Sequence, residues 1–287
     1  MTSSYQIVRI SDSHWRIGEN GVFMDLLIGS EQAMLIDTGY GYGNLPAAVR
    51  SITDKPLIIV NTHGHPDHAC GNWQFTEPIW IHPSDLKPCQ HYNTKEARKK
   101  AMPTQKPDDF LEDSYLNGGT GNLKFLTEGQ TFDLGGLQLE VVALPGHTIG
   151  SVGILNRADR EIFVGDAMNS ALFLFQDGIS ATLSVYRKTL DYAWNLPVDT
   201  LWLSHEPEPR PKEAIRIFMH CADTLDFEQA FPCHPPILEG DGVRLWVSPE
   251  FRERVDPADP GASLYLSGTL FEPDFASIYI GKAQSIL

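Results

Sequence analysis

The densest group of metal-binding side chains in this sequence lies within one short stretch, His63-Gly64-His65-Pro66-Asp67-His68. Three imidazoles and a carboxylate at this spacing have a low chance of arising at random. Residues two apart in an extended turn can direct both side chains to one side, whereas Asp67 and His68 would begin the next element and point elsewhere. The spacing therefore suggests two metal ions. The ligand types suit zinc, with iron or manganese also possible, and the absence of cysteine argues against a closed structural site.

Strand-like segments lead into this motif and into three later metal-binding residues. A continuous β-branched run over 57–61 enters the motif directly, and His147, Asp166 and His205 each stand just beyond a predicted strand. In α/β proteins, ligands and catalytic loops lie beyond the ends of strands, so we expect these residues to meet. The predicted strands are 5–10, 13–17, 22–29, 32–36, 57–61, 123–132, 137–143, 151–155, 161–164 and 200–203, and the predicted helices are 45–52 and 182–195.

With these later residues the chain resembles the metallo-β-lactamase superfamily, whose motif H-x-H-x-D-H is followed by single His, Asp and His ligands on later loops. The resemblance covers about residues 5–210 and is carried further by Pro145-Gly146-His147-Thr148, Gly165-Asp166 and Ser204-His205, in the family's order. It implies an α/β fold of the four-layer αβ/βα sandwich type, with two mixed sheets face to face, helices outside and metals at one edge.

The resemblance also implies a role for each ligand. His63, His65 and His147 would hold one metal, Asp67, His68 and His205 the second, and Asp166 would bridge them. The expected cofactor is a pair of zinc ions sharing a hydroxide, because two metals ~3.5–4 Å apart can hold both the nucleophile and the developing oxyanion. Asp67 is in addition the predicted catalytic residue, which would orient the hydroxide or shuttle its proton.

Ligating imidazoles usually donate their other N–H group to a carboxylate or carbonyl. Asp37, Thr62 and Thr148 are the predicted supporting residues. Asp37 ends a strand near the position of an equivalent aspartate in the family, although a turn aspartate before Gly39 would look the same.

The metal site does not identify the substrate, because function depends on loops grafted onto a shared scaffold. Asp166 stands where zinc β-lactamases of the first subclass have cysteine, His65 where flavodiiron proteins have glutamate, and Asn169 where acyl-homoserine lactonases carry a tyrosine. The C-terminal tail is strand-like, unlike the helical glutathione-binding domain of glyoxalase II. No single named activity follows.

We predict hydrolysis of an ester, thioester, lactone or amide carbonyl in a small molecule with an apolar portion. The predicted substrate contacts are Tyr40, Tyr42, Met168, Asn169 and Phe173, with residues 84–122. The apolar run over 168–175 fits a pocket wall and equally fits a buried strand or helix. Two other functions remain open: a mononuclear iron persulfide dioxygenase using part of the same ligand set, and a non-catalytic binding protein.

Residues 84–122 are polar, rich in Lys, Pro and Gly, and long for a connection, which predicts a helical, lid-like insertion. Its basic cluster over 95–100 is expected to be a solvated face. We assign residues 1–231 to the catalytic domain and 232–287 to a β-rich extension packed on it, with strands expected at 243–247, 263–266 and 277–280. The extension could complete a sheet, cover the site or form the interface of a homodimer.

The net charge of −15 argues against nucleic acid and anionic membrane partners. The four cysteines form no C-x-x-C pair and are expected to be reduced, buried thiols. The chain starts without an apolar signal region and has no run of membrane-spanning length, which predicts a cytoplasmic location. The remaining histidines lack ligand spacing and are expected at the surface or in the core: His14, His82, His91, His220 and His234.

Overall fold

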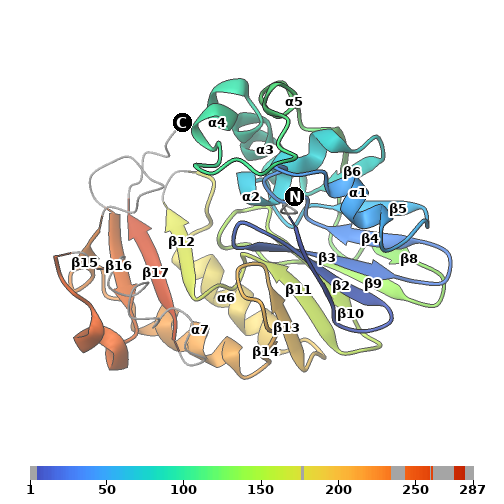
Figure 1. Ribbon diagram of the computed structural model, residues 1–287. Helices are drawn as coiled ribbons and strands as arrows, with labels where there is room; N and C mark the ends of the chain where they lie inside the picture. The colour runs from blue at the N-terminus through green and yellow to red at the C-terminus, as the bar shows by residue number, and fades with distance from the viewer. Residues whose placement is uncertain (1–4, 176–177, 234–242, 259, 261–274, 282–287) are drawn as a thin grey trace.

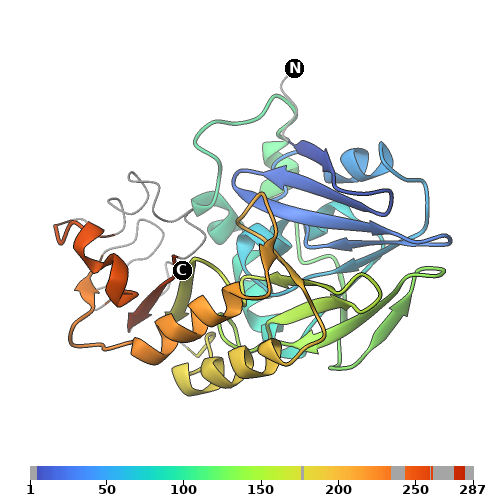
Figure 2. The same ribbon diagram turned by 90° about the horizontal axis from the view of Figure 1, so that it is seen from below.

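The computed structural model describes residues 5–175, 178–233, 243–258, 260 and 275–281 (Figure 1). Two large sheets lie face to face between outer layers of helices, and a third, smaller sheet adjoins them at one end (Figures 1 and 2). This is the predicted four-layer αβ/βα sandwich, with a helical insertion and a strand-rich C-terminal part.

Among the described residues the first sheet has seven strands, which are neighbours in chain order. Strands β1 to β4 pair antiparallel, and β4 to β7 pair in parallel. The two-residue turn between β2 and β3 is Asn20-Gly21, with φ of 48° and 84°; Asn-Gly is the pair that favours such hairpin turns. The strands are β1 (Gln6–Arg9), β2 (His14–Glu19), β3 (Val22–Ile28), β4 (Ala33–Ile36), β5 (Leu57–Val60), β6 (Pro78–Ile81) and β7 (Asn122–Phe125).

The second sheet, as far as the structure describes the chain, has six strands in the order β14-β13-β11-β10-β9-β8. They are β8 (Thr131–Asp133), β9 (Gln138–Ala143), β10 (Val152–Asn156), β11 (Glu161–Gly165), β13 (Thr200–Leu203) and β14 (Arg210–Pro211). The prediction of one strand over 123–132 was wrong, because the chain crosses between the two sheets there. Gly129, at φ 75°, lies in the crossing and donates its N–H to the Val141 carbonyl.

The third sheet joins a strand from the middle of the chain to the C-terminal strands, in the order β12-β17-β16-β15. Its members are β12 (Ala171–Phe175), β15 (Phe231–Pro232), β16 (Val243–Val247) and β17 (Ser277–Gly281). The run left open at 168–175 thus contains a strand, and it pairs in parallel with β17. Strands expected at 243–247 and 277–280 are present, and 263–266 lies outside the described residues.

The helices divide between the two outer faces. Helices α3, α4 and α5 belong to the insertion and lie on the side of the first sheet, whereas α6 and α7 cover the second sheet (Figures 1 and 2). Threonine side chains cap α4 and α6 at their N-termini, as expected for this residue type. The helices are α1 (Leu45–Arg50), α2 (Pro66–Ala69), α3 (Leu86–Tyr92), α4 (Lys95–Lys100), α5 (Glu112–Leu116), α6 (Leu183–Trp194) and α7 (Ala214–Thr224).

Hydrophobic side chains from both large sheets interdigitate between them, including Met34, Val60, Ile154 and Phe163. A larger cluster fills the space between the second sheet and helices α6 and α7. These two clusters hold the strand ends of both sheets in fixed positions. All four cysteines are buried, as predicted, and no disulfide joins them in the described structure. In the part of the chain that the structure describes, no helix is long and apolar enough to cross a membrane.

Candidate metal centre

All the predicted metal ligands lie beyond the ends of β5, β9, β11 and β13, with Asp67 and His68 in the short helix α2. The ligands form two groups, His63, His65 and His147 in the first, and Asp67, His68, Asp166 and His205 in the second. Within each group, one ligand atom of every residue lies within 4.8 Å of the others. The structure therefore brings together all the residues that the motif and the later loops predict as ligands.

In the first group three imidazole nitrogens converge on one point. His65 Nδ1 lies 3.1 Å from His63 Nε2 and 2.7 Å from His147 Nε2. Burial and the neighbouring imidazoles lower the pKa of His63, and they lower the pKa of His65 to about 3. Both rings are therefore neutral at pH 7, which is the form that binds a metal ion.

The second group alternates imidazoles and carboxylates. His205 Nε2 lies 3.2 Å from Asp67 Oδ2 and 3.3 Å from Asp166 Oδ2, and His68 Nε2 lies 3.4 Å from Asp166 Oδ1. Asp166 Oδ2 is also 3.6 Å from His147 Nε2 of the first group. One carboxylate therefore faces both groups.

Two buried atoms of the second group make no hydrogen bond among the described residues, His68 Nε2 and Asp166 Oδ1. Buried polar atoms are rarely left without a partner, because the loss of hydration is costly. A nitrogen and a carboxylate oxygen that face each other in this way are the ligand types of a divalent cation. The residues present thus fit a metal ion at this position.

The charges of the second group also favour a cation. Burial opposes protonation of the two imidazoles, but the surrounding carboxylates raise the pKa of His205 to about 10 and that of His68 above its usual range. Burial likewise opposes ionisation of Asp67 and Asp166, but the two imidazoles hold their pKa values well below the usual range. A site that attracts protons this strongly attracts a metal cation for the same reason.

Asp37 and Thr62 link the two groups from behind. His68 Nδ1 lies 2.8 Å from Asp37 Oδ2, and the Thr62 hydroxyl donates to the same oxygen at 2.8 Å. The hydroxyl proton points to Asp37, so the Thr62 oxygen is free to accept from His63 Nδ1 at 3.2 Å. Asp37 therefore orients one imidazole directly and another through Thr62, as supporting residues do in metal sites.

Thr148 contacts a different carboxylate. Its hydroxyl donates to Asp85 Oδ2 at 2.9 Å, and Asp85 also accepts from the backbone N–H groups of Gly64 at 2.7 Å and Gly150 at 3.1 Å. Asp85 thereby ties the loop of His63 to the loop of His147. Asp85 was not among the predicted supporting residues, because its only local signal is its place four residues beyond β6.

Two further imidazoles are held by backbone carbonyls. His147 Nδ1 lies 3.0 Å from the Phe173 oxygen in β12, and His205 Nδ1 lies 3.0 Å from the Gly21 oxygen in the β2–β3 turn. Each of these contacts places the proton on Nδ1 and leaves Nε2 for a metal. Backbone carbonyls from distant parts of the chain, one in a strand and one in a turn, thus set the orientation of both rings.

The predicted substrate contacts differ in their exposure. Tyr40, Asn169 and Phe173 are partly exposed. Tyr42 is largely buried, stacks on Tyr40 at 4.9 Å and donates its hydroxyl to the Ala101 carbonyl. Met168 is fully buried in the cluster beneath α6 and α7, so its side chain packs in the core and does not face a substrate.

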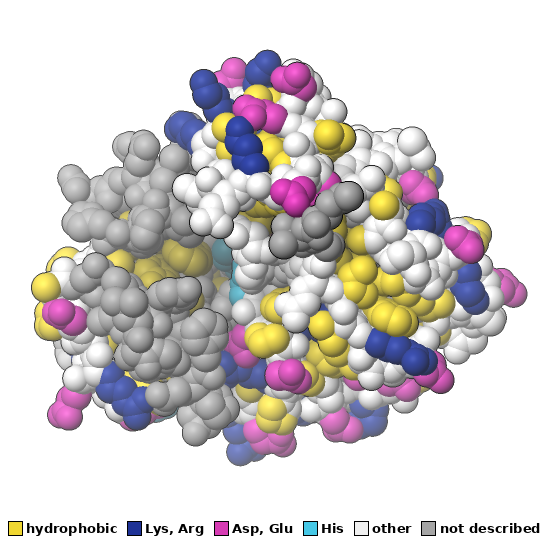
Figure 3. Space-filling view, in the orientation of Figure 1, with side chains coloured by type: hydrophobic (Ala, Val, Ile, Leu, Met, Phe, Trp, Pro, Cys, Tyr) yellow, Lys and Arg dark blue, Asp and Glu magenta, His cyan; other side chains and the backbone are white. Residues whose placement is uncertain are grey.

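Figure 3 shows histidine side chains inside a hollow on the molecular surface, with hydrophobic side chains beside them. Tyr92, from the insertion, contributes an aromatic ring with its centroid 5.2 Å from that of His65. Tyr40 lies close enough to Asp67 for this carboxylate, together with burial, to raise the tyrosine pKa. The Tyr40 hydroxyl is therefore neutral at pH 7 and can donate a hydrogen bond.

The other predicted non-ligand histidines stand apart from the metal groups. His14 is buried and lies 2.8 Å from Asp25, and His220 lies at the surface, 3.4 Å from Glu250. His82 accepts from the Ser84 N–H, and the ring of His91 packs on Tyr92. His234 lies outside the described residues.

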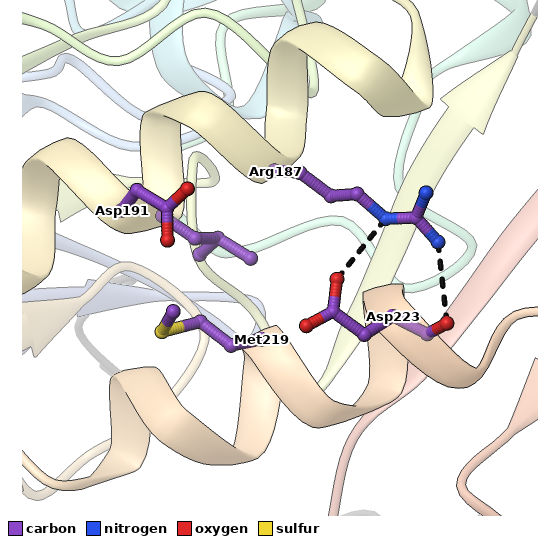
Figure 4. Close-up of a pocket in the computed structure, with 5 residues that line it drawn as sticks. Arg187, Asp191, Met219 and Asp223 are labelled. Carbon is purple, nitrogen blue, oxygen red and sulfur yellow. Dashed lines mark hydrogen bonds and ion pairs between the residues drawn. The ribbon is translucent and has the colours of Figure 1, made fainter.

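A small pocket of about 150 Å³ lies between α6 and α7, lined by Arg187, Leu190, Asp191, Met219 and Asp223 (Figure 4). Arg187 and Asp223 form an ion pair across it, 3.2 Å from Nε to Oδ1. The pocket belongs to the outer helical layer and contains none of the predicted ligands. Its position argues against a role in the metal chemistry.

Comparison with known proteins gives a family and several relatives. Residues 20–205 match the family described as the metallo-beta-lactamase superfamily. The acyl-coenzyme A thioesterase MBLAC2 of Homo sapiens is 28% identical over 160 residues, which cover 50% of this chain and 57% of the relative. The hydroxyacylglutathione hydrolase GloC of Haemophilus influenzae is 28% identical over 156 residues, covering 53% of this chain and 66% of the relative. The match thus spans less than two thirds of each relative.

Solved structures share the fold at low sequence identity. A metallo-beta-lactamase from Pontibacter korlensis has a TM-score of 0.56 at 19% identity, covering 77% of this chain and 100% of that chain. The sec-alkylsulfatase Pisa1 from Pseudomonas sp. has a TM-score of 0.57 at 12% identity, covering 76% of this chain and 41% of that chain. A β-lactamase and a sulfatase act on different bonds, so the shared scaffold leaves the substrate open.

Proposed function

The chain belongs to the metallo-β-lactamase superfamily, and we propose that it is a hydrolase with a two-metal centre that cleaves an ester, thioester, lactone or amide bond of a small molecule. The observation that carries the proposal is the position of Asp166, whose carboxylate faces both ligand groups. A single shared carboxylate between two complete groups is the arrangement expected of a dinuclear centre.

We propose zinc as the metal, held by His63, His65 and His147 at one position and by Asp67, His68 and His205 at the other, with Asp166 shared. Bound divalent ions supply hydroxide near neutral pH and polarise the substrate carbonyl. Asp67, whose Oδ2 lies 3.2 Å from His205 Nε2, would accept a hydrogen bond from the attacking water and so orient it. Asp37 and Thr62 keep the imidazoles oriented while charge develops.

Substrate contacts are proposed for the partly exposed residues beside the ligands. The Tyr40 hydroxyl would donate to a substrate oxygen, since its raised pKa keeps its proton in place. The carbonyl contact with His147 places Phe173 beside the first ligand group, and its ring stacks on Tyr279 at 4.6 Å. Phe173 would therefore pack against an apolar portion of the substrate. Asn169, between Asp166 and β12, completes the proposed set.

The test combines elemental analysis of the freshly purified chain with a hydrolase panel. Acyl-coenzyme A and hydroxyacylglutathione enter the panel first, because they match the names of two relatives. Two zinc ions and turnover of a carbonyl substrate are expected. One iron per chain, with oxygen consumed in the presence of a persulfide, would support the dioxygenase instead. Turnover of phosphodiesters alone would contradict carbonyl hydrolysis.

A single substitution tests the ligand assignment. His68→Ala should remove the second ion and retain the first, because the first group contains none of its atoms. Its control is His220→Ala, a surface histidine near Glu250, which should keep both ions. Equal metal content in His68→Ala and the wild type would refute the assignment.

A further inference from the structure

The loop over 203–207, which carries His205, is held by one buried guanidinium from the opposite sheet. Arg16 in β2 is 1% exposed. Its Nη2 donates to the Leu203 carbonyl at 2.8 Å, and its Nη1 donates to the carbonyls of Glu206 at 2.6 Å and Pro207 at 3.0 Å. These three acceptors lie on both sides of His205 in the chain, so the guanidinium fixes the loop at its two flanks.

The remaining contacts of Arg16 fix the guanidinium itself. Its Nε donates to Asp25 Oδ1 at 3.0 Å, and the guanidinium lies over the rings of Phe23, at 4.6 Å, and Trp202, at 5.0 Å. The planar guanidinium therefore donates hydrogen bonds along its edge and packs its flat faces against aromatic rings. Lysine has no such fork, so it cannot reproduce this set of contacts.

The β2–β3 hairpin adds two contacts to the same loop. The Phe23 N–H donates to the Ser204 carbonyl at 2.8 Å, and the Gly21 carbonyl accepts from His205 Nδ1 at 3.0 Å. The His205 side chain is 29% exposed, more than the other three residues of its group. Its position consequently depends on support from the hairpin more than on burial.

We propose that Arg16 and the Asn20-Gly21 turn position His205 for the second metal ion. They hold His205 Nε2 opposite Asp67 Oδ2 and Asp166 Oδ2, at 3.2 and 3.3 Å. The inference rests on the proposed two-metal function. The first group takes its support from Thr62 and Phe173 instead, so loss of Arg16 should affect only one of the two ions.

The experiment is calorimetric titration of the metal-free, full-length chain with Zn²⁺, combined with elemental analysis. Arg16→Lys should weaken binding of the second Zn²⁺ by roughly 10–100-fold, as loss of a supporting residue does, and leave the first within about twofold. Arg187→Lys is the matched control, because its guanidinium also donates to backbone carbonyls but lies between α6 and α7 (Figure 4). Both ions should bind the control as they bind the wild type.

A double-mutant cycle shows whether the effect passes through His205. In a His205→Ala background, Arg16→Lys should cause little further loss of Zn²⁺ affinity. A loss as large as in the wild-type background would mean general destabilisation and would overturn the proposal.

If Arg16→Lys does not fold, Gly21→Ala replaces it. An added Cβ meets no heavy atom within 4 Å, but φ of 84° strains any residue other than glycine, so the substitution disturbs only the turn. Selective weakening of the second ion is expected, and unchanged binding would overturn the proposal. Fewer than two ions in the wild type would refute the two-metal function itself. Two ions in the wild type, with the second bound equally tightly by Arg16→Lys, would refute only the positioning role.

Discussion

Glu19 is a buried carboxyl group that holds the loop carrying Tyr40 and Tyr42. Its oxygens accept from the backbone N–H groups of Gly41 at 3.0 Å, Tyr42 at 2.8 Å and Gly43 at 3.3 Å. Burial raises the pKa of Glu19 from 4.5 to about 7, although these hydrogen bonds oppose the rise. The group therefore changes charge close to neutral pH.

Glu19→Gln should remove a pH dependence of stability. Between pH 4.5 and about 7 the folded chain retains a proton that the unfolded chain has released, so the free energy of unfolding falls as pH rises through this window. The total effect is on the order of 3 kcal/mol. Urea unfolding at about pH 5 and about pH 8 should show the variant gaining stability relative to the wild type at the higher pH. Exposed Glu128→Gln is the control, and an equal difference at both pH values would contradict the prediction.

The sequence predicts single residues well where the signal is local. The spacing of His63 to His68 predicts these residues as candidate ligands. His147, Asp166 and His205 are predicted by their places after strands. Arg16, Glu19 and Asp85 act through partners that only the folded chain brings near: Arg16 donates to a carbonyl 190 positions away. No short-range pattern carries that information.

At the scale of elements, the centre depends on how loops are tied to one another. Asp85, at the end of a single 3-10 turn (Pro83–Asp85), is 1% exposed and accepts hydrogen bonds from the loops on either side of the first ligand group. It thus connects the loop after β5 with the loop before β10.

Asp85→Ala should lower the free energy of unfolding by about 3 kcal/mol, because buried donors on Gly64, Thr148 and Gly150 lose their acceptor. Chemical unfolding of the metal-free chain measures this change without any contribution from metal binding. Asp133→Ala is the control, since Asp133 is exposed and accepts from one backbone N–H, that of Gly135. A loss no larger than that of the control would show that the two loops do not depend on this carboxylate.

Element boundaries followed the sequence where turn residues bound an apolar run, as Gly135-Gly136 and Pro145-Gly146 do on either side of β9. Strands β9 to β11 and helix α6 begin and end within a few residues of their predicted limits. The run around β12 was ambiguous because both faces are covered: Leu172 and Leu174 pack in the main core, and Phe173 and Phe175 pack with the C-terminal strands. Without an exposed face there is no alternation of polarity to read.

For the whole molecule, the centre joins the two large sheets. The candidate ligands follow strands of the first sheet, at His63 to His68, and of the second, at His147, Asp166 and His205. A metal ion that binds only the folded arrangement stabilises it by mass action. Binding therefore strengthens the contact between the sheets as well as the site.

Removal of metal with a chelator should lower the melting temperature of the entire chain. At a free metal concentration 100 to 1,000 times the Kd, bound metal contributes about 3 to 4 kcal/mol per ion. Differential scanning calorimetry before and after chelation, and after Zn²⁺ is restored, measures the shift. His68→Ala should show a smaller shift because it retains one ion. An unchanged melting temperature in the wild type would mean that the ligands do not couple the sheets.

The large sequence separation between Arg16 and its carbonyl acceptors has a consequence for the nascent chain. Its carbonyl partner at Glu206 is made 190 residues later, which at ~5–20 residues per second is a delay of ~10–40 seconds. During that interval Arg16 has its partner Asp25 in β3, but its three native carbonyl acceptors at Leu203, Glu206 and Pro207 do not yet exist, and burying the guanidinium without them would be costly. The first sheet can pair its strands early, but it cannot close over Arg16 until the loop of His205 has left the ribosome. Synthesis order thus makes the proposed second metal position one of the last features of the protein to form.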